Sequence, residues 1–139
     1  MAHKITTNWK GNLLFDSDNP SGHHVLMDTD VEGQKREGLS PKALMLSSLA
    51  GCSGLDVVSI LEKMKVKVDD FKMEVEGLLT EEHPKHYHTV TVDYHFTGKE
   101  LNEERINRAV NLSVEKYCGV MEMFRQFAEV KTTIHLHNG

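Results

Sequence analysis

The stretch from Ser40 to Leu61 constrains the fold more than any other part of the chain. Ser40 can cap free backbone N–H groups and Pro41 fits a first helical position, so a helix is predicted to begin here. Residues 43–46 are apolar on every side, which predicts that this end of the helix is buried all round. The helix is expected to continue to Met64 or Lys65, where basic side chains suit a last turn.

One face of this predicted helix is small and polar and contains a thiol. Its members recur at helical spacing: Ser48, Cys52, Asp56 and Ser59. Gly51 and Gly54 lie beside the thiol, and each glycine costs about 1 kcal/mol relative to alanine inside a helix. We therefore expect another element to approach the helix closely at these glycines.

Composition narrows the classes of protein that the chain can belong to. Its 139 residues are 39% hydrophobic and 27% charged, typical of one globular domain spanning residues 1–139. The net charge of −5 argues against nucleic acid as a partner. No apolar run approaches the roughly 20 residues that span a bilayer, and the N-terminus has no apolar signal core. These features predict a cytoplasmic protein without a membrane partner.

The remaining segments predict an α+β chain with antiparallel sheet. Alternating apolar and polar residues indicate strands, and helical spacing with Asn102 as a cap indicates a second helix that bends at residues 117–119. The predicted strands are residues 5–9, 12–15, 24–27, 71–79, 89–96 and 130–136, and the later helical segments are residues 102–116 and 120–128.

The two cysteines, Cys52 and Cys118, allow two interpretations. In a cytoplasmic protein they are expected to be free thiols or a redox pair rather than a structural disulfide. They could equally be small buried hydrophobic residues, as many free cysteines are. Asp56, one turn from Cys52, would raise the pKa of a nearby thiol if charged, so a reactive thiolate would need a cation. Arg36, Lys42 and Lys10 are the candidates.

Four blocks of the sequence resemble the OsmC/Ohr family of thiol-dependent hydroperoxide reductases, in matching order across roughly residues 38–127. The blocks are SPKAL at 40–44, LAGCSGLDVV at 49–58, EEHP at 81–84 and LSVEKYCGV at 112–120. They are most similar to the OsmC-like branch. In this resemblance Cys52 matches the peroxidatic cysteine and Cys118 the resolving cysteine.

The resemblance implies an OsmC-like α+β fold: an intertwined homodimer with two long central helices wrapped by antiparallel sheets. It also implies that Cys52 reduces a hydroperoxide, becomes a sulfenic acid and forms a disulfide with Cys118. An external dithiol would then reset the pair. No metal, flavin or haem is required, so no cofactor is expected.

The sequence differs from the family's hydroperoxidases beside the predicted site. Those enzymes carry an arginine on an N-terminal strand, which supports the thiolate, and a glutamate just after the helix-opening proline. Here Lys42 and Ala43 follow the proline, and Arg36 is the only arginine before the helix. Arg36, Lys42 and Asp56 are therefore the candidate thiolate-supporting or substrate-binding residues. The alternative function is a non-catalytic relative that binds a small apolar or thiol-containing molecule.

Histidines raise a separate question of metal binding. His83, His86 and His88 lie within six residues and could meet one ion. The stronger interpretation places His83 in a family block and the other two on a solvent-facing strand, so no metal site is predicted. His135 and His137 are expected on the surface of the last strand.

Overall fold

The computed structural model describes all 139 residues, and the chain divides into two compact units, residues 1–45 and 46–139. In the first unit three short strands pair antiparallel in the order β1-β2-β3. Their bounds are β1 (Thr7–Trp9), β2 (Phe15–Asp18) and β3 (His24–Met27). The strand predicted at 12–15 instead begins at Phe15, because Asp16 and Asp18 are held in the ladder: Asp18 accepts from the Thr6 N–H at 2.7 Å and Asp16 contacts His24 at 2.9 Å.

Helix α1 (Pro41–Lys63) is the long helix that the sequence predicts. At its start the Ser40 hydroxyl accepts a hydrogen bond from the Ala43 N–H at 3.5 Å. At its end the N–H groups of Lys65 and Val66 donate back to the carbonyls of Glu62 and Leu61, a Schellman closure. Lys65 takes the left-handed conformation that this closure needs.

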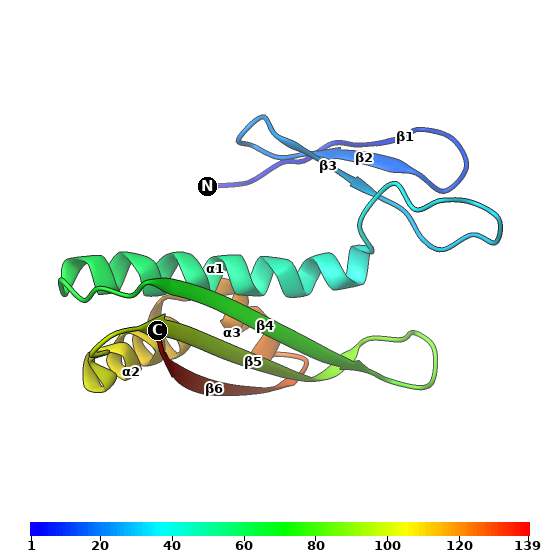
Figure 1. The fold of residues 1–139 in the computed structure, drawn as a ribbon. Coiled ribbons are helices and arrows are strands. Elements are labelled where there is room, and N and C mark those ends of the chain that lie inside the picture. The colour runs from blue at the N-terminus through cyan, green and yellow to red at the C-terminus, as the bar shows by residue number, and fades with distance from the viewer. The chain divides into compact units, whose positions relative to one another are not determined.

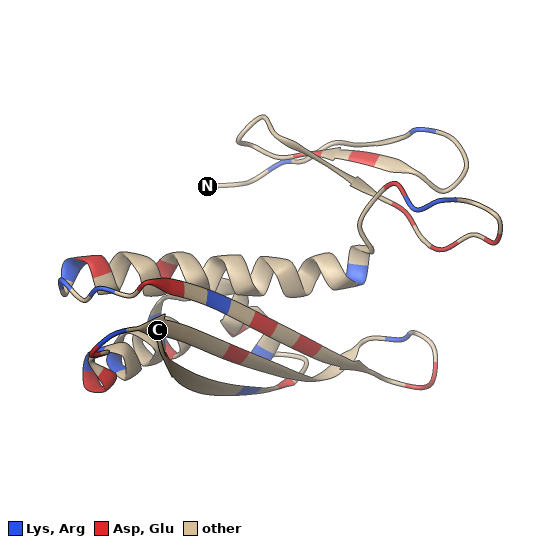
Figure 2. Ribbon diagram, viewed as in Figure 1, with Lys and Arg blue, Asp and Glu red and all other residues tan.

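Helix α1 buries one narrow face and leaves another open. The buried residues recur every four positions: Leu49, Ser53, Val57 and Leu61. The prediction that residues 43–46 are buried all round is wrong for a single chain, because Ala43 is exposed and Met45 is 45% exposed. Figure 2 shows that charged residues gather mainly at the two ends of this helix.

Helix α1 is also long and apolar enough to cross a membrane, by length and composition alone. The expectation that no apolar segment is long enough to span a bilayer was therefore wrong. Serine and glycine interrupt the apolar residues of α1, but they lower its average hydropathy only a little. One such helix does not identify a membrane protein, since core helices of other proteins can be equally long and apolar.

The second unit contains a three-stranded sheet in the order β4-β5-β6 (Figure 1). Strands β4 (Asp70–Leu79) and β5 (Tyr87–Gly98) pair antiparallel, as predicted. The last strand, β6 (Glu129–Asn138), instead pairs with β5 in parallel. The segment between β5 and β6 contains helices, and a helical crossover of this kind is what returns the chain for parallel pairing.

Three helical segments join β5 to β6: α2 (Glu103–Leu112), the π-helix η1 (Ser113–Tyr117) and α3 (Gly119–Arg125). The Asn102 side chain caps α2 by accepting from the Arg105 N–H at 3.1 Å, as predicted. The bend predicted at residues 117–119 lies at the end of the π-helix, where the Cys118 N–H donates to the Ser113 carbonyl at 2.8 Å. The helical connection therefore changes direction at Cys118.

The core of the second unit lies between the sheet and the helices. Alternate residues of β5, including Tyr94 and Phe96, are fully buried, and so are Ile106 and Ala109 of α2. Gly54 lets α1 approach β4, because a Cβ there would be 3.3 Å from the Met73 sulfur. The close approach expected at Gly54 is thus observed, whereas a Cβ on Gly51 would have open space.

Candidate active site

The two cysteines come from different helical segments of the second unit. Cys52 lies in the middle of α1 and is partly exposed, whereas Cys118 follows the π-helix and is only 3% exposed. Cys52 packs against the hydrophobic core that contains Cys118, and it is near enough to raise the pKa of the Cys118 thiol. Both cysteines are free. The structure therefore brings together two reduced thiols, one reachable from solvent and one covered.

Cys118 is held as a protonated thiol at neutral pH. Burial raises its pKa most, and its hydrogen bond with Cys52 and the negative charge of Asp56 raise it further. The Met121 N–H acts in the opposite direction, because it donates to the Cys118 sulfur at 3.3 Å and lowers the pKa. Cys118 thus caps the first turn of α3 while it contacts Cys52.

A chain of buried hydroxyl groups lies beside the cysteine pair. The Ser53 hydroxyl is 2.7 Å from the Tyr94 hydroxyl and 2.8 Å from the Ser113 hydroxyl. The Ser113 hydroxyl donates to Asp56 Oδ2 at 3.0 Å and to the Ser53 carbonyl at 3.3 Å. We call Ser53, Asp56, Tyr94 and Ser113 the hydroxyl network. Burial raises the pKa of Tyr94 to about 12, so its phenol remains a donor.

The sequence indicated parts of this arrangement only. Cys52, Cys118 and Asp56 are among the predicted site residues, and the structure gathers them in the second unit. Ser53, Tyr94 and Ser113 were not predicted as site residues. The only signal for them was that Tyr94 and Ser113 fall on apolar faces, where a polar group needs a partner.

Arg36 and Lys42, the predicted cationic residues, belong to the first unit. The Arg36 guanidinium donates to Asp28 at 2.6 Å and to Asp30 at 3.0 Å, and also to the carbonyls of Asp28 and Gly38. These partners raise the pKa of Arg36, with the Asp30 hydrogen bond acting most strongly. Arg36 therefore fastens the loop that precedes α1. Lys42 is exposed in the first turn of α1.

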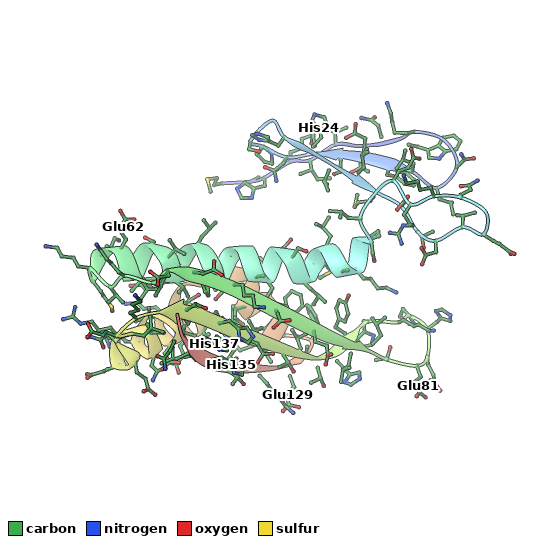
Figure 3. All side chains as sticks on the ribbon, in the orientation of Figure 1. His24, Glu62, Glu81, Glu129, His135 and His137 are labelled. Carbon is green, nitrogen blue, oxygen red and sulfur yellow. The ribbon has the colours of Figure 1, made fainter.

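Three histidines of the second sheet, His95, His135 and His137, lie against one another on its polar face. His95 contacts Glu74 and His137, each at 2.9 Å, and its ring stacks on that of His135. His135 contacts Asp93 at 2.8 Å. Figure 3 labels His135 and His137 of β6, which the sequence predicted to lie on the surface. No group of three or more potential ligands has metal-binding geometry.

Comparison with known proteins identifies the family. The family model described as OsmC-like protein matches residues 33–133. The chain belongs to the OsmC family. This confirms the resemblance drawn from the sequence blocks.

Two relatives show which proteins this OsmC-family chain is similar to. It is 35% identical over 122 residues to Protein YhfA of Escherichia coli K12, which covers 88% of this chain and 89% of that protein. A hypothetical protein from Aquifex aeolicus VF5 is 29% identical, with a TM-score of 0.87 over 100% of this chain and 98% of the other.

A third comparison shows the fold alone. The organic hydroperoxide resistance protein OhrB of Bacillus subtilis is 18% identical, with a TM-score of 0.64 over 96% of this chain and 98% of that one. The α+β architecture of this chain, with two three-stranded sheets and a long helix, is therefore the OsmC fold.

Proposed function

We propose that this protein is a thiol-dependent peroxidase that reduces organic hydroperoxides, with Cys52 as the reacting thiol and Cys118 as its resolving partner. The observation that carries the proposal is that a partly exposed free thiol, Cys52, packs against the core that contains a buried free thiol, Cys118. Family membership supports it, as does the shared fold with a protein named for organic hydroperoxide resistance. Hydrogen peroxide is a second possible substrate.

The proposed cycle has three steps: reduction of the hydroperoxide, formation of a disulfide and reduction of that disulfide. The Cys52 thiolate attacks the hydroperoxide O–O bond, becomes a sulfenic acid and releases an alkoxide, which solvent protonates to the alcohol. The Cys118 sulfur then attacks the Cys52 sulfur, and the Cys118 proton leaves with the hydroxide as water. An external dithiol is oxidised as it reduces the Cys52–Cys118 disulfide back to two thiols.

The different surroundings of the two cysteines support this assignment of roles. A hydroperoxide can reach the partly exposed Cys52, while Cys118 is covered and keeps its proton because its pKa is raised. A buried protonated thiol is a poor first nucleophile. In the second step its proton passes to the departing hydroxide as the S–S bond forms, which gives water.

The test compares wild type with Cys52→Ser, using cumene hydroperoxide and hydrogen peroxide with dithiothreitol or a dihydrolipoyl compound as reductant. Wild type should consume hydroperoxide, and Cys52→Ser should fall to the uncatalysed rate. Cys118→Ser is the matched control, because it should still form a trappable sulfenic acid on Cys52 without a disulfide. A wild type no faster than Cys52→Ser with both peroxides would refute the enzyme proposal.

The alternative function is a non-catalytic OsmC-fold protein that binds a small apolar or thiol-containing ligand. It is favoured by one observation: Arg36 is already paired with Asp28 and Asp30, and no carboxylate follows Pro41. If wild type lacks peroxidase activity, a mixed disulfide formed with a small thiol at Cys52 but not in Cys52→Ser would support this alternative.

We also propose that the chain acts as one OsmC-like domain in a cytoplasmic homodimer. Exposed apolar residues on α1 support the dimer, because Leu55 is 76% exposed and Val58 is 53% exposed in the single chain. Such residues are expected to pack against a second copy rather than lie in water or lipid.

A further inference from the structure

One residue of the hydroxyl network, Ser113, makes hydrogen bonds close to both cysteines. Ser113 opens the π-helix that Cys118 follows, and its carbonyl accepts the Cys118 N–H at 2.8 Å. Its hydroxyl contacts Ser53, the residue that follows Cys52, at 2.8 Å. Ser113 thus links the backbone that carries Cys118 to the helix that carries Cys52.

The orientation of the network follows from the chemistry of its members. The carboxylate and carbonyl oxygens accept hydrogen bonds, so the Ser113 hydroxyl donates to Asp56 and shares the same proton with the Ser53 carbonyl. The Ser113 oxygen can then accept from Ser53, and the Ser53 oxygen can accept from Tyr94. Each hydroxyl proton has a defined acceptor, so the network has one favoured arrangement.

The buried hydroxyl at position 113 is explained by its hydrogen bonds and not by packing alone. Ser53, Tyr94 and Ser113 are all fully buried, and a buried hydroxyl is unfavourable unless it is hydrogen-bonded. Here every buried side-chain polar atom has a partner. The Ser113 hydroxyl makes three contacts, all with α1, across 57 to 60 positions of sequence. These contacts hold the start of the π-helix against α1.

We propose that Ser113 is a positioning residue of the cysteine pair: its hydroxyl fixes the π-helix to α1, so that the Cys118 sulfur is held against the Cys52 sulfur for disulfide formation. This inference rests on the proposed function, because it concerns the resolving step. A disulfide needs its two sulfurs at bonding distance with a restricted dihedral angle. Holding the thiols together raises their effective concentration and favours the disulfide.

The experiment measures the equilibrium between dithiol and disulfide forms in mixtures of reduced and oxidised dithiothreitol, with free thiols counted after alkylation. Ser113→Ala should lower the equilibrium constant for disulfide formation by up to about tenfold, because the less restrained dithiol then holds its two sulfurs together for less of the time. No hydroperoxide is present, so the result does not depend on peroxidase activity.

Ser53→Ala is the matched control. It removes two buried hydroxyl contacts, to Tyr94 and to Ser113, but leaves Ser113 bonded to Asp56 and to the residue 53 carbonyl. Both variants should lose stability in urea when reduced, but Ser53→Ala should change the disulfide equilibrium by less than about threefold. Equal shifts in the two variants, or no shift in Ser113→Ala, would show a merely structural role.

Asp56 provides a second test if Ser113→Ala does not fold. Asp56→Asn and Asp56→Ala both remove the charge, but only Asp56→Asn keeps an acceptor for the Ser113 hydroxyl. Asp56→Ala should therefore disfavour the disulfide more than Asp56→Asn does, and equal equilibria would overturn the proposal. An inactive wild type in which Ser113→Ala still shifts the equilibrium would refute the peroxidase and keep the positioning role.

Discussion

Cys118 shows how burial and a neighbouring charge act on a single residue. Its pKa is raised from that of an ordinary cysteine, first by burial and then by Cys52 and Asp56. In the unfolded chain the same thiol ionises near its usual pKa. Between the two values the unfolded state therefore binds fewer protons than the folded state.

The free energy of unfolding should consequently fall as pH rises above about 9, by at most about 1.4 kcal/mol per pH unit for one proton. Below that pH the contribution of Cys118 is fully present. Urea unfolding of the reduced protein between pH 7 and 10 measures the effect. Tyr94 has a raised pKa of about 12 and an ordinary value of 10, so its own contribution begins to fall only near pH 10.

Cys118→Ser is the control for this measurement. Serine keeps a small polar side chain at the N-terminus of α3 but does not ionise in this range. The variant should lose less stability than wild type between pH 8.5 and 10. Identical slopes in the two proteins would contradict the raised pKa.

The sequence located the cysteines but not the hydroxyl network, for a physical reason. Helical spacing alone shows where each cysteine lies: Cys52 is on a polar helix face, and Cys118 is in the bend between two helical segments. The partners of Ser53 lie 41 and 60 positions away, so no local pattern connects them. A serine counts as polar in a pattern of apolar and polar residues, which predicts exposure rather than a buried hydrogen bond.

At the scale of elements, β4 and β5 are joined by close packing at Gly77. A Cβ built on Gly77 would be 2.5 Å from the Tyr87 ring, which is nearly buried on the neighbouring strand. Gly77→Ala should therefore destabilise the protein by about 1–3 kcal/mol, the usual cost of overpacking. The midpoint of urea unfolding measures this change.

Tyr87→Leu tests the cause of that loss. Leucine removes the ring atoms that the new methyl group would meet, so Gly77→Ala should cost less in this background than in wild type. If the cost is the same in both backgrounds, the clash with Tyr87 does not explain it.

Elements with a strong period were predictable, whereas their partners were not. Alternation indicated β4, β5 and β6, and the spacing with Asn102 indicated α2, with bounds close to those observed. The antiparallel sheet predicted for the chain did not anticipate the parallel pairing of β6, because alternation marks a strand with one exposed face and does not give the direction of its partner. Strand β2 was misplaced because aspartates usually mark turns, yet here they bond within the sheet.

At the scale of the whole molecule, α1 exposes more apolar surface than a stable single chain usually tolerates. Only 22% of its most apolar window is buried in the chain, and Met45, Leu55 and Val58 remain exposed. The sequence predicted burial at the start of this helix, and a second copy would satisfy that prediction.

Sedimentation should therefore give twice the mass of one chain at micromolar concentration. Leu55→Glu would place a charge on the exposed face and should shift the protein toward monomer, whereas Glu62→Gln, near the charged end of α1, should remain dimeric (Figure 3). A wild-type protein that sediments as a monomer at this concentration would contradict the homodimer.

The π-helix has a consequence for the length of the chain. A π-turn contains one residue more than the α-turn it replaces. Here the turn is closed by the bond from the Cys118 N–H to the Ser113 carbonyl. Deleting one residue between Ser113 and Tyr117 would let the same two groups close an ordinary α-turn, so Cys118 and the helix after it would keep their direction. The position of the buried thiol therefore depends on the two ends of this turn rather than on the number of residues inside it.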